Sequence, residues 1–489
     1  MTYAFTFDAT FCSGCKACQA ACKDKNNLPL GVLWRRVIEV SGGTWQQRGE
    51  AWNNTVFAYN LSMACNHCVH PKCAGVCPTD AYVVRADGIV LLDTSKCMGC
   101  GYCAWACPYG APQYNPDAGH MTKCNFCFED LEQGLPPACV AACPMRVLDY
   151  GEVISDPATQ ELRLWDAPAE THPYPLPGYS HSQPRLAIKP HAAMNTSEEK
   201  FVANLEEIRP QVPSKREDVP LILFTLLVQM AVGGFWAMLW LFPRVWAPVE
   251  NNTTSLQWLP SLLIGLCLGA GLFASLAHLG AKKNAWRALG NLRKSWLSRE
   301  VLFTGLFGAG WLVTTLESVI WHHSTSAAVL WTVEWAALTA TFGLGLVYSM
   351  SRVYRLPAIP AWNTWRTNAV FMVSTLLLGQ SMMAVLRSYE SSVTGLQVPS
   401  GQWIIIDASI LVLLLMQLLV MHKPFSRDPF HSVRVGLIFV GMVLTAMNSL
   451  IFGVVPIWVS LLIFLTLVAE EAMGRWSFYQ AAHESFLSA

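Results

Sequence analysis

The chain has 489 residues, enough for two or three domains, and 53% of them are hydrophobic. Its 33 basic and 33 acidic residues cancel, so the bulk charge indicates neither nucleic-acid binding nor an acidic partner. The composition differs between the two halves: 16 of the 17 cysteines lie before residue 144, and long apolar runs dominate the second half.

The first residues show no targeting pattern. Residues 1–8 have neither a basic start nor an apolar run, and no twin-arginine pair precedes the first cysteine. We therefore expect no export signal in this chain. Disulfide scaffolds are usually short secreted chains, which disfavours a disulfide role for the cysteines.

Four groups of four cysteines occupy residues 1–155, with β-like stretches such as Val56–Leu61 and Gly88–Asp93 between them. The groups are Cys12-x2-Cys15-x2-Cys18-x3-Cys22, Cys65-x2-Cys68-x4-Cys73-x3-Cys77, Cys97-x2-Cys100-x2-Cys103-x3-Cys107 and Cys124-x2-Cys127-x11-Cys139-x3-Cys143. In the bacterial ferredoxin pattern, three close thiolates bind one [4Fe–4S] cluster and the fourth binds its neighbour. Sixteen thiolates match four clusters with none left over, whereas zinc sites do not use this regular spacing. We predict an α+β ferredoxin-like domain with four clusters.

Cross-ligation leaves open which groups pair; we predict that the first group pairs with the fourth and the second with the third. The predicted ligand sets are site 1 (Cys12, Cys15, Cys18, Cys143), site 2 (Cys22, Cys124, Cys127, Cys139), site 3 (Cys65, Cys68, Cys73, Cys107) and site 4 (Cys77, Cys97, Cys100, Cys103). Four clusters in series would conduct electrons. This half contains neither a Gly-rich nucleotide loop nor a nucleophile–base constellation, so we predict electron transfer rather than substrate chemistry.

Residues 156–219 are rich in proline, which disfavours regular structure. We predict an extended strap over the domain surface, followed by a linker. Within it, Thr196–Glu199 resembles a helix cap, so Asn195–Ile208 is expected to form a short helix.

Residues 220–489 contain eight apolar stretches, most of them near the roughly 20 residues that a membrane-spanning helix needs. They are Leu221–Phe242, Leu256–Leu279, Val301–Trp321, Ala327–Tyr348, Ala369–Leu386, Ile404–Met421, Val433–Phe452 and Val454–Ala469. We predict an all-α transmembrane bundle of eight helices that contacts membrane lipid. Cys267 is expected to be a packed apolar residue.

Two ionisable residues at span ends are candidates for a quinone site. His278 ends the second stretch and Glu300 opens the third, and the short connection puts both on one side of the membrane. They could accept the two protons released by quinol oxidation. Alternatively, they are an interfacial histidine and a glutamate favoured by the helix dipole. Glu317 and Glu334 are expected to be structural, and no haem is predicted because the histidines fall at span ends.

The segments Cys97–Asn115 and Gly119–Cys124, together with the four cysteine groups, resemble the iron–sulfur subunit of the dimethyl sulfoxide reductase family. That resemblance implies a separate catalytic partner with a molybdenum bis-pyranopterin cofactor. It also implies that site 1 lies nearest this partner and site 4 nearest the membrane. Residues 220–489 resemble the family's anchor subunit, and His278 and Glu300 match its quinol-site residues. Arg352-Val-Tyr354 and Glu471–Arg475 also match family segments. The two subunits are ordinarily separate chains, so their fusion departs from the family pattern.

Basic residues are concentrated on one side of the predicted bundle. With eight spans, the cluster domain lies on the side that carries Lys282, Lys283, Arg287, Arg293, Lys294, Arg299, Arg352, Arg355, Arg366, Lys423, Arg427, Arg434 and Arg475. The opposite loops carry little beyond Arg244 and Arg387. The positive-inside rule therefore predicts a cytoplasmic cluster domain, unless these cations dock the cluster domain or lipid headgroups. The resemblance implies the outer side, because well-known family members face outward.

The leading hypothesis is an electron-transfer and quinone-reactive subunit that passes electrons from quinol, such as menaquinol, to a partner reducing an S- or N-oxide. The alternative is the reverse direction, in which a dehydrogenase partner oxidises a substrate such as sulfite and reduces quinone. A transporter with a redox regulator is a third hypothesis. The lack of an evident internal repeat or broken-helix pair disfavours it.

Overall fold

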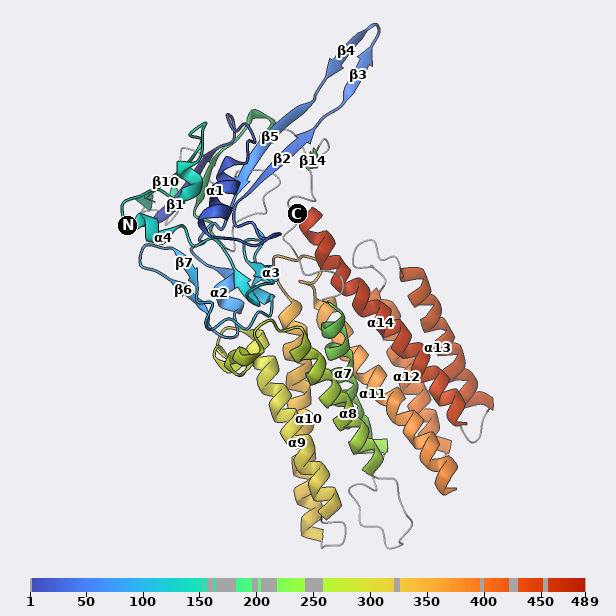
Figure 1. Ribbon diagram of the computed structural model, residues 1–489. Helices are drawn as coiled ribbons and strands as arrows, with labels where there is room; N and C mark the ends of the chain where they lie inside the picture. The colour runs from blue at the N-terminus through green and yellow to red at the C-terminus, as the bar shows by residue number, and fades with distance from the viewer. Residues whose placement is uncertain are drawn as a thin grey trace. The chain divides into compact units, whose positions relative to one another are not determined.

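The computed structural model describes most of the chain (Figure 1). The described residues are 2–152, 154–155, 162–163, 182–195, 201–203, 218–241, 258–320, 326–395, 400–421, 430–451 and 456–488. They form two compact units. Unit 1 comprises Met1–Ser214, Leu279–Ser295 and Ser485–Ala489, and unit 2 comprises Lys215–His278 and Trp296–Glu484.

Unit 1 is built from small sheets and short helices. Its strands are β1 (Tyr3–Asp8), β2 (Arg36–Gly42), β3 (Trp45–Arg48), β4 (Ala51–Asn54), β5 (Phe57–Met63), β6 (Tyr82–Val84), β7 (Val90–Leu92), β8 (Gln113–Asn115), β9 (His120–Thr122), β10 (Leu148–Glu152), β11 (Ile154–Ser155), β12 (Leu162–Arg163), β13 (Leu186–Lys189) and β14 (Phe201–Ala203). Its helices are α1 (Ala17–Lys25), α2 (Lys72–Val76), α3 (Tyr102–Ala106), α4 (Phe128–Leu131), α5 (Ala138–Ala141), and the 3-10 helices η1 (Ala192–Asn195) and η4 (Lys282–Leu289). The β-like stretches predicted from the sequence correspond to β5 and β7.

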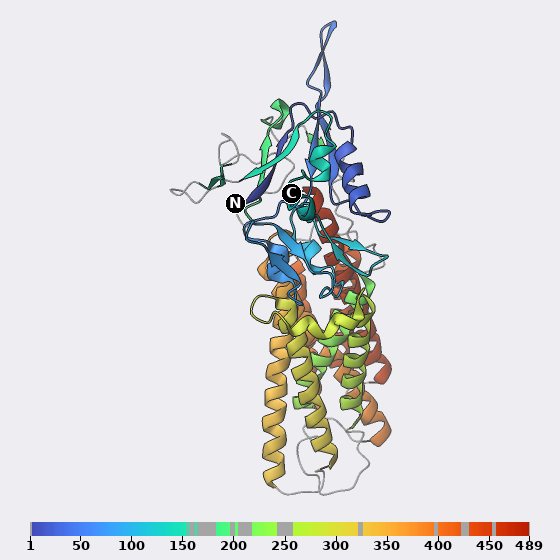
Figure 2. The same cartoon turned by 60° about the vertical axis from the view of Figure 1, so that its left-hand side comes forward.

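The core of unit 1 lies between two three-stranded sheets and the cysteine loops. Strand β1 pairs antiparallel with β10 and parallel with β13, and β2 lies between β5 and β14. Alternate side chains of β1, Phe5 and Phe7, are buried with Cys18, Cys22 and other cysteines in one apolar cluster. The β3–β4 ribbon projects from the rest of unit 1 in both views (Figure 1, Figure 2). The cysteines therefore form part of the folded core.

The predicted helix over Asn195–Ile208 is wrong where the structure describes it. Residues 201–203 form strand β14, whose backbone pairs antiparallel with β2 from Val40 to Gly42. Pairing with the edge of β2 satisfies the backbone hydrogen-bonding groups of residues 201–203. A helix would have satisfied the same groups internally, but only a weak cap pattern favoured it. Residues 196–200 and 204–208 of that prediction, and most of the predicted strap, lie outside the described residues.

Unit 2 contains a long helix at each of the eight predicted apolar stretches in the part that the structure describes (Figure 1). These are α7 (Val219–Leu241), α8 (Trp258–Ala277), α9 (Trp296–Ile320), α10 (Ser326–Tyr354), α11 (Trp365–Thr394), α12 (Ser400–Met421), α13 (His431–Ile451) and α14 (Ile457–Ser488). Six of them, all except α9 and α10, are long and apolar enough to cross a membrane. The chain is a multi-pass membrane protein, and the predicted count of eight spans is not confirmed.

Helices α7 and α11 approach closely through two glycines. A Cβ atom added at Gly379 would overlap the backbone of Gly233 and Gly234, and one added at Gly233 would overlap the backbone of Thr375. Small residues at such crossings let membrane helices pack backbone to backbone.

Replacing Gly379 with alanine should therefore destabilise unit 2. We expect the overlap to cost about 1 to 3 kcal/mol of unfolding free energy, more than alanine's helix propensity restores. Thermal unfolding in detergent would measure the effect. Gly269→Ala in α8 is the matched control, because its Cβ would meet no atom within 4 Å. Equal unfolding midpoints for the two variants would contradict this account of the crossing.

Candidate metal centres

The four Cys-x2-Cys loops share one backbone feature. The residue before the second cysteine has a positive φ in every group: 68° at Gly14, 42° at His67, 74° at Gly99 and 65° at Phe126. This turn directs backbone N–H groups toward sulfur, as in the 3.4 Å bonds from Gly99 to Cys97 Sγ and from Phe126 to Cys124 Sγ. Consecutive N–H groups in such turns form a concave binding site for anions, which suits a thiolate-bound metal cluster.

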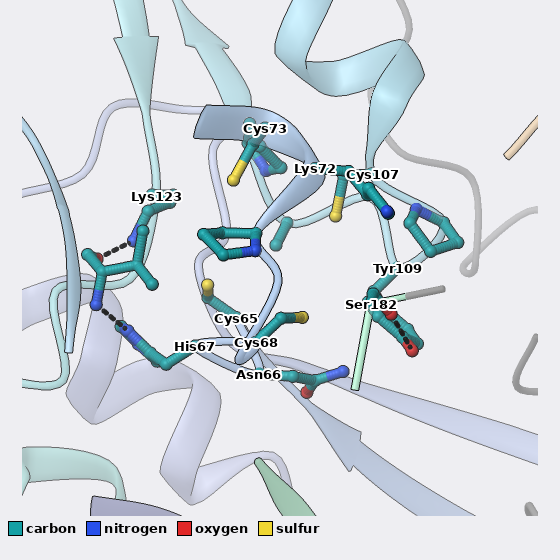
Figure 3. A pocket seen from close by; sticks show the side chains of 15 residues that line it. Cys65, Asn66, His67, Cys68, Lys72, Cys73, Cys107, Tyr109, Lys123 and Ser182 are labelled. Carbon is teal, nitrogen blue, oxygen red and sulfur yellow. Dashed lines mark hydrogen bonds between the residues drawn. The ribbon is translucent and has the colours of Figure 1, made fainter. Parts of the chain in front are cut away.

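The four cysteines predicted for site 3 line one cavity (Figure 3). Cys65, Cys68, Cys73 and Cys107 present their sulfurs to it, from segments that are up to 42 residues apart in the sequence. Lys123 also lines it; this buried amine donates to the carbonyls of Val90 and Cys124. Site 3 thus combines four thiols with a nearby fixed positive charge.

A second cavity is lined by the four cysteines predicted for site 1. Cys12 and Cys15 approach it from the loop after β1, Cys18 from the first turn of α1, and Cys143 from the loop before β10. None of the 17 cysteines, all of which the structure describes, forms a disulfide bond. The two cavities therefore gather the cysteines that the cross-ligation pattern had paired.

Electrostatic interactions group the remaining cysteines. For site 2, burial raises the pKa of Cys22 to about 12, and the thiolates of Cys139 and Cys127 add to the increase. For site 4, burial raises the pKa of Cys100 to about 12, with further increases from Cys77 and Cys97. Cys22 and Cys100 thus interact with members of their predicted sets, whereas Cys124 of site 2 also interacts with Cys65 of site 3. The ligand sets of sites 2 and 4 therefore stay a prediction.

Interactions of the same kind also occur between cysteines of different predicted sets. Cys18 of site 1 interacts with Cys139 of site 2, and Cys124 of site 2 interacts with Cys65 of site 3. The Tyr82 hydroxyl interacts with Cys73 of site 3 and Cys103 of site 4. Interactions of this kind therefore connect site 1 with site 2, site 2 with site 3 and site 3 with site 4. The order of the four sets along the path of the electrons stays a prediction.

The chemistry of these residues fits iron–sulfur clusters. Burial raises the pKa of the Cys22 and Cys100 thiols, and bringing several thiolates together without a cation would be unfavourable. Cluster iron offsets this repulsion because metal ligation favours the deprotonated sulfur. The residues that would hold the clusters are the sixteen cysteines of sites 1 to 4.

Residues 279–295 fold with the cysteine loops as part of unit 1. Asn284 Nδ2 donates to the carbonyl of Cys97 at 2.8 Å, and Asn291 Nδ2 donates to that of Cys77 at 2.9 Å. Gly280 packs so closely on Gly119 that a Cβ atom there would overlap the Gly119 backbone. The segment between the second and third predicted spans thus supports two cysteines of site 4.

Replacing Asn291 with alanine should make the cluster at site 4 more labile. The buried Cys77 carbonyl would lose its donor, at a cost of about 1 to 3 kcal/mol. Iron release to a chelator would measure this effect. Asn26→Ala is the matched control, because Asn26 Nδ2 donates to the carbonyl of Cys22 in site 2 at 2.9 Å. If both variants released iron from the same cluster, the role assigned to Asn291 would be wrong.

Comparison with known proteins identifies the family. A family model described as the DMSO reductase anchor subunit (DmsC) matches residues 214–480, more than half of the chain. The chain belongs to the DMSO reductase family. A second model, a 4Fe-4S dicluster domain, matches residues 56–153. The chain therefore fuses an iron–sulfur subunit with an anchor subunit, which confirms the resemblance noted from its motifs.

Relatives of the iron–sulfur half belong to several complexes. The B subunit of the anaerobic dimethyl sulfoxide reductase of Escherichia coli (strain K12) is 43% identical over 210 residues, 42% of this chain and 98% of the relative. The formate dehydrogenase iron–sulfur subunit of Wolinella succinogenes is 38% identical over 170 residues, 30% of this chain and 80% of the relative. The thiosulfate reductase electron transfer subunit PhsB of Salmonella typhi is 36% identical over 171 residues, which cover 35% of this chain and 84% of the relative. Similarity in this half therefore does not specify the substrate.

The two quinone-site candidates of this DMSO reductase family chain both lie in unit 2. His278 follows α8 and is half-buried, and its Nδ1 has no hydrogen-bond partner among the described residues. Glu300, in the first two turns of α9, is 3% exposed. No hydrogen bond joins the two side chains in the described part of unit 2. Their assignment as a quinone site therefore stays a prediction.

Glu300 lies within electrostatic range of a tyrosine pair that could not be predicted from the sequence. The hydroxyls of Tyr354 (α10) and Tyr479 (α14) are 2.5 Å apart, and the Glu300 carboxylate acts electrostatically on both. The hydroxyl pair gives the buried carboxyl polar neighbours on two other helices.

Arg434 and Arg475, which the positive-inside prediction counts among the exposed basic residues, are buried. Arg434 is 5% exposed and its Nη2 lies 2.8 Å from Glu470 Oε1, while Arg475 is 2% exposed and its Nη2 donates to Gln229 Oε1 at 2.7 Å. Glu471 accepts from Ser374 and Gln417. These groups form polar contacts inside the anchor. Because Arg434 and Arg475 are buried there, they do not indicate which side of the membrane the loops face.

The minor predictions have mixed outcomes. Cys267 is partly buried, and its thiol lies 3.9 Å from Met230 Sδ, consistent with a packed residue. Glu334 is exposed, whereas Glu317 has one buried oxygen without a partner among the described residues. His322, His323 and His422 lie outside the described residues.

Proposed function

We propose that the chain is the electron-transfer and quinone-reactive subunit of a membrane-bound molybdopterin oxidoreductase. It would take electrons from a quinol and deliver them through four [4Fe–4S] clusters to a molybdopterin partner that reduces an S- or N-oxide. The observation that supports this proposal is the pair of hydrogen bonds by which segment 279–295, between the second and third predicted spans, contacts the carbonyls of Cys97 and Cys77, two cysteines of predicted site 4.

Bound iron–sulfur clusters supply one-electron carriers, and the sixteen cysteines of sites 1 to 4 would be their ligands. Site 4 is the proposed entry point for electrons from the membrane. Its cysteine loops are hydrogen-bonded to the segment whose ends adjoin His278 and, after Ser295, the start of α9. Site 1, at the other end of the series, would face the catalytic partner.

His278 and Glu300 would serve the proton chemistry of quinol oxidation. A His278 ring nitrogen would hydrogen-bond one quinol oxygen, and the Glu300 carboxylate would accept a proton from the site. The Tyr354–Tyr479 hydroxyl pair, beside Glu300, would hold the proton-accepting group in a polar environment. Burial of Glu300 among these groups supports this role over an interfacial, solvent-facing glutamate.

We propose eight spans and a cytoplasmic cluster domain. Helices α9 and α10 contain 25 and 29 residues, lengths of about 38 and 44 Å that suffice to cross a bilayer. The η4 segment carries Lys282, Lys283 and Arg287, with Arg293 and Lys294 after it, which supports the cytoplasmic side. Protease digestion of unit 1 in intact spheroplasts would contradict this orientation.

A dehydrogenase that reduces quinone is the second candidate function. It is favoured by the similarity to an iron–sulfur subunit of a formate dehydrogenase and by a cytoplasmic location of the catalytic site. The same residues would then work in reverse, with Glu300 donating a proton to the reduced quinone.

Purification of the complex from native membranes would test the proposed function. We expect a molybdopterin subunit to co-purify and quinol oxidation to depend on an S- or N-oxide. If the complex instead reduced quinone with an oxidisable substrate, the second candidate would be correct. Absence of any molybdopterin subunit from an iron-loaded complex would contradict both.

A further inference from the structure

Arg35 is a buried cation beside sites 1 and 2. It lies immediately before β2, is 2% exposed, and stacks over the Phe5 ring at 4.5 Å. Its Nη1 donates to the carbonyl of Ser62 at 3.2 Å and to Ser62 Oγ at 3.1 Å. Its Nε and Nη2 are buried and have no hydrogen-bond partner in the described part of the chain. A buried guanidinium with two unused donor positions requires a compensating negative charge nearby.

Hydrogen bonds connect Arg35 to one cysteine of each site. Ser62 Oγ accepts from Arg35 and lies 3.4 Å from Cys18 Sγ of site 1, so its own proton is free to point at that sulfur. The backbone N–H of Arg35 donates to the thiol of Cys22 in site 2. Arg35 therefore reaches both sites. Its side chain reaches Cys18 of site 1 through Ser62, and its backbone N–H reaches Cys22 of site 2.

The charges that act on Arg35 belong to these two sites. The cysteines that act electrostatically on Arg35 are Cys139, Cys124, Cys18 and Cys22. An arginine guanidinium stays protonated in proteins, and these cysteines, once they ligate a cluster as thiolates, would supply the compensating negative charge. Arg36 differs: its Nη2 donates to the carbonyls of Tyr109 and Gly110, and it interacts with Cys107 of site 3.

We propose that Arg35 is a positioning residue that raises the reduction potentials of the clusters at sites 1 and 2 together. Each cluster becomes more negative by one charge when it accepts an electron, and a fixed buried cation stabilises that reduced state. Hydrogen bonds to cluster-bound sulfur act in the same direction. Arg35 would thus favour the transfer of electrons toward the end of the series that includes site 1. This inference goes beyond the proposed function, because it holds for either direction of net flow and for any substrate of the partner.

Redox titration of the full chain in membranes, followed by electron paramagnetic resonance, tests the inference. Arg35→Gln should lower two of the four midpoint potentials, those of sites 1 and 2, and leave the other two unchanged. Arg35→Lys keeps the charge and should shift the same two potentials less. The matched control Arg36→Gln should leave sites 1 and 2 at their original potentials, because that guanidinium lies by site 3.

Ser62→Ala provides a second test if Arg35→Gln does not assemble its clusters. It keeps Arg35 but removes the hydroxyl beside Cys18, so only the site 1 potential should fall. Four unchanged potentials in Arg35→Gln, an equal shift of all four, or no shift in Ser62→Ala would overturn the inference. Equal shifts in Arg35→Gln and Arg35→Lys would also overturn it, because they would show that shape rather than charge matters.

Discussion

Replacing His278 with alanine should abolish quinol-dependent turnover while all four clusters still assemble. The variant loses the ring nitrogen that would orient one quinol oxygen and take part in proton transfer, an effect of about 100-fold or more. The cysteines of sites 1 to 4 all lie in unit 1, whereas His278 lies in unit 2, so cluster assembly should be unaffected.

A soluble dye separates this loss from a general failure of electron transfer. Dye-derived electrons entering at exposed clusters or at the partner should still reach the catalytic site, so dye-dependent activity should persist. His431→Ala, at the start of α13, is a matched control that should keep quinol activity. Full quinol activity in His278→Ala would place the quinone elsewhere, and Arg352 and Glu471 would then be the next residues to test.

Replacing Cys100 with serine should destroy or convert the cluster at site 4 and leave the other three intact. Cys100 interacts with Cys77 and Cys97 of the same set. We expect a loss of about four of the roughly sixteen irons, or a smaller loss if the cluster is converted, and one altered paramagnetic signal. Quinol-dependent activity should fall with it, because the proposed entry point is disrupted.

Cys267→Ser is the matched control for this substitution. Cys267 lies in α8, outside the four sets, and should contribute no iron ligand. Loss of the cluster that involves Cys124, instead of the one that involves Cys100, would show that the cross-ligation scheme is wrong.

The cysteine sets could be predicted because cluster binding imposes a local spacing. Each Cys-x2-Cys loop needs one residue with positive φ, and this requirement is met by glycine at residues 14 and 99. At His67 and Phe126 the same turn is formed by residues that rarely adopt it, so the cysteine spacing was the better signal. The eight apolar stretches of the sequence likewise predicted the positions of the eight long helices that the structure describes in unit 2.

Contacts between distant segments could not be predicted in this way. Asn284 and Asn291 look like ordinary loop residues in the sequence, and their role depends on carbonyls about 190 to 215 residues earlier in the chain. Strand β14 replaced a predicted helix because the edge of β2 was available to it. Arg434 and Arg475 looked like loop cations because burial of a charge depends on partners in other helices.

Reoxidation of the chemically reduced chain by a quinone tests most directly whether the chain carries four clusters that react with quinone. The purified full chain, without its partner, would be reduced anaerobically and mixed with a menaquinone analogue while the cluster signals are followed. We expect about sixteen irons per chain and rapid reoxidation of the clusters by quinone. His278→Ala should lose this reoxidation. Several zinc atoms with little iron would contradict this expectation, as would reduced clusters that ferricyanide reoxidises but quinone does not.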